Sequence, residues 1–160
     1  MQARLTTEFN LEEYVPLIKE VIESGGEFRL YPRGISMLPV LRQGIDSVVL
    51  VSPEKELKKR DMIFYRRLSG QFVLHRIVGI SNDGTYILCG DNQTALEKGI
   101  TADMIIASVT AVYRGEKRIE KKSPSRRLYE LFWCIMPLRK ILLFAKRVFS
   151  KIKRTIFKSK

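Results

Sequence analysis

Hydrophobic and polar positions alternate in short runs along most of the first 113 residues, and this pattern predicts a mainly β body. The runs are rich in β-branched and aromatic residues and are bounded by Gly, Pro, Asn and Asp. Two turn signals, Leu68-Ser69-Gly70 and Asn82-Asp83-Gly84, separate neighbouring runs. Residues 90–99 are polar and are predicted as a loop. The expected strands cover residues 27–31, 46–51, 61–67, 71–80, 85–89 and 104–113.

A helix is expected before the first strand. Asn10 and Glu13 have the spacing of a capping box, in which a short polar side chain and a Glu three residues later satisfy the first N–H groups. Pro16 conflicts with a straight helix, so we expect a kink or a later start. Gly25-Gly26 ends the segment. Apolar residues follow the cap at helical spacing, namely Leu11, Val15, Ile18 and Ile22.

The last 47 residues carry nearly all of the net charge. Residues 1–113 hold 13 Lys and Arg against 14 Asp and Glu, whereas residues 114–160 hold 16 against 3. From residue 138 onwards, apolar side chains fall on one helical face and basic side chains cover most of the remainder. We therefore divide the chain into an N-terminal helix (1–26), a β body (27–115), a linker (116–127) and a basic amphipathic helical tail (128–160).

Such a tail favours an anionic membrane surface as its partner. A transmembrane helix needs about 20 apolar residues with few charges, and the segment Leu128–Ala145 contains Glu130, Arg139 and Lys140. Nucleic acid would be attracted by the basic residues, but it does not require so heavy an apolar stripe. We predict peripheral association with the cytoplasmic face of a membrane through residues 128–160. The alternative is a membrane protein tethered by its C-terminus.

The candidate chemistry lies in the nearly uncharged stretch Tyr31–Leu41. Ser36 stands between Gly34, which can adopt backbone angles closed to other residues, and Pro39, which bars helix at the residue before it. The stretch therefore predicts a sharp turn that displays the serine hydroxyl, with Met37 among the apolar anchors. A rigidly held serine suits nucleophilic catalysis, although turn serines that bond their own backbone are common.

Three ordered segments resemble the signal peptidase I and LexA-like serine peptidases, in the branch that uses histidine as the base. Gly34-x-Ser36-Met37-x-Pro39 resembles the nucleophile box. Val73–Val78, with His75 before Arg76, resembles the general-base box, and Cys89–Asn92 resembles the Gly-Asp-Asn box that follows it. The resemblance covers residues 29–115 and implies a coiled β-sheet or barrel body with its site in a shallow groove.

The resemblance also implies a role for each residue. Ser36 would be the nucleophile and His75, the only histidine in the chain, the general base. Asp91 or Glu97 would orient the imidazole; the family has aspartate where this chain has Glu97. The Ser36 N–H would help to stabilise the oxyanion, since Gly34 supplies no hydroxyl. Met37 and Pro39 would support the turn.

We thus predict a serine endopeptidase that cleaves a leader, signal or precursor peptide by a Ser–His mechanism. No pattern for a metal or another cofactor is present, and oligomeric state is not predicted. The alternatives are a self-cleaving or non-catalytic LexA-like regulator and a scaffold that binds peptides or membranes without turnover.

Overall fold

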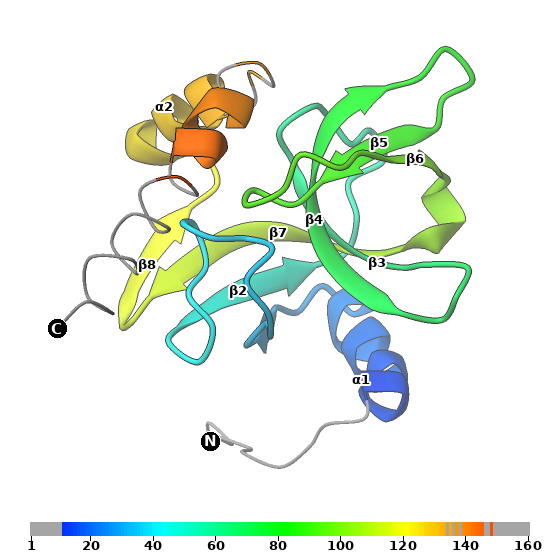
Figure 1. Ribbon diagram of the computed structural model, residues 1–160. Helices are drawn as coiled ribbons and strands as arrows, with labels where there is room; N and C mark the ends of the chain where they lie inside the picture. The colour runs from blue at the N-terminus through cyan, green and yellow to red at the C-terminus, as the bar shows by residue number, and fades with distance from the viewer. Residues whose placement is uncertain (1–10, 134, 136, 138, 146–147, 149–160) are drawn as a thin grey trace, which may run out of the picture.

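A computed structural model describes residues 11–133, 135, 137, 139–145 and 148 (Figure 1). The elements are, in chain order, α1 (Leu11–Glu23), β1 (Phe28–Leu30), β2 (Asp46–Val51), β3 (Met62–Arg66), β4 (Phe72–Ile80), β5 (Tyr86–Cys89), β6 (Glu97–Ile100), the short 3-10 helix η1 (Ala102–Met104), β7 (Ile105–Arg114), β8 (Lys117–Glu120) and α2 (Pro124–Trp133). Residues 139–145 are helical as well. The predicted mainly β body with an N-terminal helix is therefore confirmed.

All eight strands belong to one antiparallel sheet. The strand order is β1-β2-β7-β3-β4-β5-β6, and β8 also pairs with β7. The long strand β7 joins the two halves: one of its edges pairs with β2, and the other pairs first with β3 and then with β8. Within the described residues the pairing leaves β1 and β6 as the two ends of an open sheet, so it does not close the barrel that the resemblance implies.

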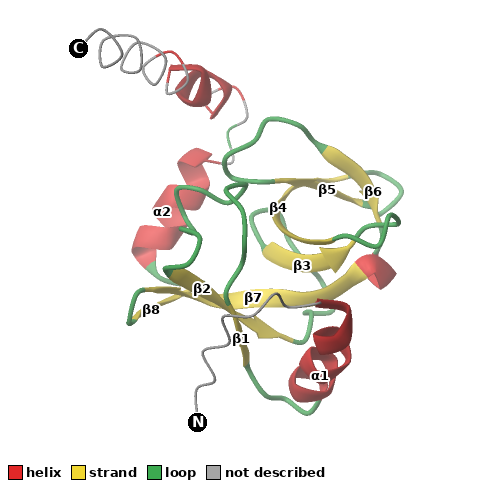
Figure 2. Ribbon diagram, turned by 60° about the horizontal axis from the view of Figure 1, so that its bottom comes forward, coloured by secondary structure: helices red, strands yellow, loops and turns green. Residues whose placement is uncertain are grey.

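The two faces of the sheet carry two hydrophobic clusters. Successive side chains of a strand point to opposite faces, and in β3 the buried Phe64 belongs to one cluster while Ile63 belongs to the other. Helix α1 covers the first cluster with Ile18 and Ile22 (Figure 2). The second cluster packs Ile63 against residues of β4, β5 and β6 and lies on the face that carries His75.

Three predictions about local structure need correction. Residues 90–99 are not wholly loop, because Glu97 begins β6 and pairs with Leu88 of β5. The predicted linker 116–127 contains β8 and the first turn of α2. Of the two outcomes expected at Pro16, a later start is wrong, since α1 begins at Leu11 and includes Pro16. The proposed capping residue Asn10 and the distal tail 149–160 lie outside the described residues.

The C-terminal helical segments lie at the margin of the body, away from α1 (Figures 1 and 2). Proline at the first position suits α2, because the N–H that proline lacks would have no partner within the helix. Among the described residues, no helix combines the length and apolar character that crossing a bilayer requires.

Two neighbouring residues of α1 test its packing. Ile18 is fully buried in the first cluster and Leu17 is 47% exposed. Ile18→Ala removes buried methylene groups and leaves a cavity, so we expect it to lower the free energy of unfolding by about 2–5 kcal/mol. Leu17→Ala, the matched control, should change it by about 0.5 kcal/mol or less. Urea unfolding of both variants measures the difference, and equal effects would contradict the packing described.

Candidate active site

The turn that carries Ser36 is built as the sequence predicts. Gly34 has φ of 92°, in the region that favours glycine, and its N–H donates to Gln43 Oε1 at 3.0 Å. Met37 is buried in the first hydrophobic cluster, and its carbonyl accepts from the Leu41 N–H at 2.9 Å. Ser36 itself is partly exposed and follows the exposed Ile35. The anchored turn therefore presents the serine at the surface.

The loop after β5 binds the back of this turn. The Asn92 N–H donates to the Ser36 carbonyl oxygen at 2.7 Å, and the Asn92 side-chain amide donates to the Ile35 carbonyl oxygen at 3.1 Å. The Gly-Asp-Asn segment thus holds the serine turn through the main chain of residues 35 and 36.

Gly90 allows the serine turn and the histidine to come together. A Cβ atom added at Gly90 would lie 2.8 Å from the Ser36 carbonyl oxygen and 3.0 Å from His75 Nε2. Those two atoms are therefore no farther apart than the sum of the two distances. The first contact is with backbone, which cannot move aside easily, so this position requires glycine. The Ser36 main chain and the His75 ring, thirty-nine residues apart in sequence, therefore both lie against Gly90.

The other ring nitrogen of His75 is engaged on the side away from the turn. Nδ1 lies 3.1 Å from Glu97 Oε1 and 3.4 Å from the Tyr65 hydroxyl. A carboxylate accepts hydrogen bonds and cannot donate one, so it favours the tautomer with its proton on Nδ1. Nε2, which faces Gly90 and the serine turn, then carries the lone pair that a general base needs.

Glu97 is fixed by two donors besides the histidine. Tyr65 donates its hydroxyl to Glu97 Oε2 at 2.8 Å, and Arg67 binds both carboxylate oxygens. Burial alone would raise the pKa of Glu97, but the hydrogen bonds from Arg67 and Tyr65 outweigh it and lower the pKa. Burial, followed by the Glu97 carboxylate, raises the pKa of Tyr65. Glu97 therefore stays ionised and Tyr65 stays a donor at neutral pH.

The surroundings of His75 favour its neutral form over the protonated one. Its side chain is almost fully buried, and burial lowers its pKa below the ordinary value because the charged form loses its hydration. The Glu97 carboxylate partly opposes this effect, while Arg67 reinforces it. At neutral pH the imidazole is uncharged and able to accept a proton, and Glu97 is placed to stabilise the imidazolium that results.

Asp91 is placed differently from Glu97. It is fully buried and binds Arg76 in a bidentate pair, with contacts of 2.9 Å from Nε and 2.8 Å from Nη2. Arg76 also donates to Glu130 of α2 at 2.8 Å, and Arg139 lies 3.8 Å from Asp91. Of the two acids that the sequence left open, Glu97 contacts His75, whereas Asp91 joins β4 to the C-terminal segments.

Sequence reasoning missed Tyr65 and Arg67. The hairpin of β3 and β4 was predicted, and its register pairs Ile63 with His75. Tyr65, two residues from Ile63, lies on the same face, where it is a diagonal neighbour of His75. The register of the hairpin would therefore have indicated Tyr65, but no pattern in the sequence marks Arg67.

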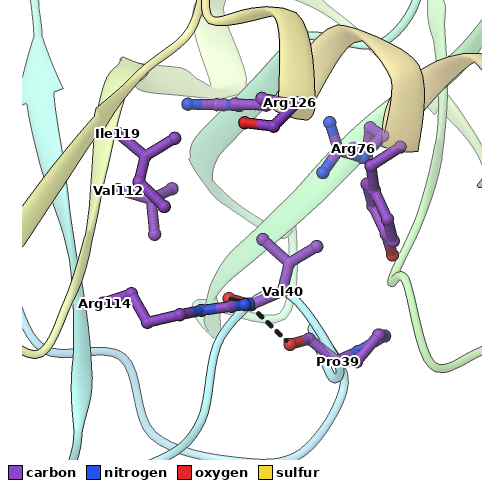
Figure 3. A pocket seen from close by; sticks show the side chains of 9 residues that line it. Pro39, Val40, Arg76, Val112, Arg114, Ile119 and Arg126 are labelled. Atoms are coloured by element: carbon purple, nitrogen blue, oxygen red, sulfur yellow. Dashed lines mark hydrogen bonds between the residues drawn. The ribbon is translucent and has the colours of Figure 1, made fainter.

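A pocket of about 270 Å³ lies next to the segment that follows the serine turn (Figure 3). Pro39 and Val40, just past the serine turn, form one wall, and Arg114 spans it by donating to both carbonyl oxygens. In the described part of the chain, neither Ser36 nor His75 is among the residues that line it. Its lining comprises Pro39, Val40, Arg76, Val112, Arg114, Ile119, Ser125, Arg126 and Tyr129.

The single histidine makes the base directly measurable. NMR titration of the one imidazole signal should give a pKa below the ordinary value of about 6.5, because the buried ring disfavours charge. Glu97→Gln removes the carboxylate that favours the imidazolium, so the pKa should fall further. Glu116→Gln, at an exposed position on the β7–β8 turn, should leave it unchanged. A pKa at or above the ordinary value, or no response to Glu97→Gln, would contradict the site described.

Asp91 should act on stability. Asp91→Asn removes the carboxylate that makes the bidentate bond to the buried Arg76 guanidinium, and breaking a buried pair from one side costs about 3–5 kcal/mol. We expect that loss in the free energy of unfolding by urea. Glu116→Gln removes the same charge at an exposed site and should have almost no effect. An Asp91→Asn variant as stable as this control would show that the buried pair does not hold the structure.

Comparison of the chain with models of protein families, with curated proteins and with solved structures found no match. The functional interpretation therefore rests on the geometry around Ser36, His75 and Glu97 and on the three segments that resemble peptidase motifs.

Proposed function

We propose that the chain is a serine endopeptidase of the signal-peptidase type, in which Ser36, His75 and Glu97 form the catalytic set. The observation that carries the proposal is the orientation of the only imidazole. Its Nδ1 is held by Glu97, and its Nε2 lies across Gly90 from the serine turn. A base needs both features, because one nitrogen must be fixed for the other to accept a proton in a defined direction.

The proposed reaction is peptide-bond hydrolysis through an acyl-serine intermediate. Ser36 Oγ attacks the scissile carbonyl carbon while His75 Nε2 takes the hydroxyl proton. The negative charge moves to the carbonyl oxygen, which the Ser36 N–H can stabilise. The imidazolium, next to the Glu97 carboxylate, then gives its proton to the leaving amine as the C–N bond breaks. Water, deprotonated by the same nitrogen, then attacks the acyl carbon, and the imidazolium returns the proton to Ser36 Oγ as the acyl–serine bond breaks.

The exposure of the site favours a peptide substrate over a small molecule. Ser36 is partly exposed, and Ile35 beside it is 65% exposed. A site of this kind is open to an extended chain, and extended peptides often bind by adding a strand to a sheet. We propose a leader, signal or precursor peptide as the substrate class.

A covalent serine probe tests the assignment. A fluorophosphonate should label the wild type, and Ser36→Ala should abolish labelling because the nucleophile is lost. His75→Gln should slow it by about 10²–10⁴-fold, the usual contribution of a general base. Glu97→Gln should slow it less, since it alters the base without removing it.

The matched control is Ser69→Ala, at an exposed serine of the β3–β4 turn, which should label at the wild-type rate. Rates are measured by intact-protein mass spectrometry on variants whose unfolding transitions match the wild type. Labelling that persists in Ser36→Ala and in His75→Gln would remove the peptidase assignment and leave a scaffold without turnover.

A further inference from the structure

Helix α2 has its amphipathic pattern reversed. Surface helices of globular proteins usually bury their apolar side chains, but the buried residues of α2 are Arg126 and Glu130. Its large aliphatic and aromatic residues Leu128, Leu131 and Phe132 are 47–58% exposed. Helix α2 therefore exposes its large apolar side chains to the surroundings. It buries Arg126 and Glu130 against the protein.

The exposed residues form one stripe. Leu128, Leu131 and Phe132 have the spacing i, i+3 and i+4, which places them on one side of α2. Ile135, beyond the end of α2, is 47% exposed as well. The next helical segment repeats the pattern with Ile141 and Phe144, both exposed. We call Leu128, Leu131 and Phe132 the outer stripe. Helix α2, which carries it, lies at the margin of the body (Figure 1).

The inner side of α2 is bonded to the catalytic body. Glu130 accepts from Arg126 at 3.0 Å and from Arg76 of β4 at 2.8 Å. One helical turn on, Trp133 Nε1 donates to the Asp91 carbonyl oxygen at 2.7 Å. Buried ionic bonds of this kind are costly to break from one side. The orientation of α2, and with it the direction of the outer stripe, is therefore fixed relative to β4.

The charge of the surrounding segment identifies what covers the stripe. Residues 114–160 hold 16 Lys and Arg against 3 Asp and Glu. Arg127, next to Leu128 in α2, and Lys140 in the following helical segment are both exposed. A second copy would bring two such positive segments together. Nucleic acid would satisfy the charge but not the apolar side chains. An anionic bilayer interface satisfies both, since acyl chains receive the stripe and head groups receive the basic side chains.

We propose that the outer stripe of α2 docks on an anionic lipid surface and holds the catalytic body there in a fixed orientation. His75 and Arg76 are neighbours on β4, and Arg76 forms an ion pair with Glu130 of α2. This ion pair therefore connects the helix that would contact lipid to the strand that carries the proposed base. On the proposed function, the substrate is then a peptide presented at the membrane surface. The docking itself does not depend on catalysis.

Vesicle flotation of the full chain tests the docking. The wild type should float with phosphatidylcholine vesicles that contain phosphatidylglycerol and bind pure phosphatidylcholine more weakly. Changing Leu128, Leu131 and Phe132 together to Ser should lower the partition coefficient at least about tenfold, because the apolar contribution is lost. The matched control changes the exposed Leu17, Leu68 and Ile80 to Ser and should bind as the wild type does.

Two measurements keep the test decisive. Ser36→Ala should float as the wild type does, so a failure of catalysis and a failure of docking are distinguishable. Trp133, the only tryptophan, should be quenched by brominated acyl chains, because α2 is only about 10 Å across. This second readout does not require a substitution in the helix.

Three results would overturn the proposal. Equal flotation of the stripe variant and the wild type would assign binding to charge alone. Unquenched Trp133 in a chain that floats would assign binding to a part of the chain other than α2. Light scattering that shows a wild-type dimer, and a monomer for the stripe variant, would assign the stripe to a contact between copies.

Discussion

The buried pair of Arg76 and Asp91 is the interaction on which the arrangement of this protein depends. Both side chains are fully buried and meet through two parallel hydrogen bonds. Asp91 belongs to the loop that binds the serine turn, and Arg76 follows the histidine on β4. The pair therefore fixes the position of the two segments that carry the proposed nucleophile and base. Desolvation of two such groups is costly, and here it is compensated by further hydrogen bonds that Arg76 donates to Glu130 and to the Arg60 carbonyl oxygen.

Gly90 allows the serine turn and the histidine strand β4 to approach each other closely. The serine carbonyl and the histidine ring both approach this residue so closely that no side chain fits. Catalysis by a serine and a base depends on placement to a fraction of an ångström. For the proposed site, close backbone approach and a second layer of donors restrict the positions of the two segments. Tyr65 and Arg67 hold Glu97, and Glu97 holds the imidazole.

Some of this could be predicted from the sequence, for identifiable physical reasons. Strands such as β2 and β7 bury long runs of Val, Ile and Ala, so their hydrophobic pattern identifies them. Strands β6 and β8 begin with Glu97 and Lys117 and carry mostly polar residues. They form because a neighbouring strand offers unpaired backbone groups. The hydrophobic pattern of the sequence does not reveal such pairing. Ser36 and His75 were indicated by short motifs, whereas Asp91 and Glu97 could be told apart only by their neighbours. The pattern of the tail predicted an amphipathic helix, but the direction in which α2 faces depends on Arg76.

The alternation of side chains along β4 has a wider consequence. Adjacent residues of a strand point to opposite faces, so the imidazole and the guanidinium that follows it serve two sides of the same sheet. Cutting the polypeptide before Pro124 would therefore do more than shorten it. Arg76 would lose its bond to Glu130. Water would then reach Arg76 on β4, the strand that carries His75. Helix α2 in this sense shields the buried ion pair beside β4 from solvent.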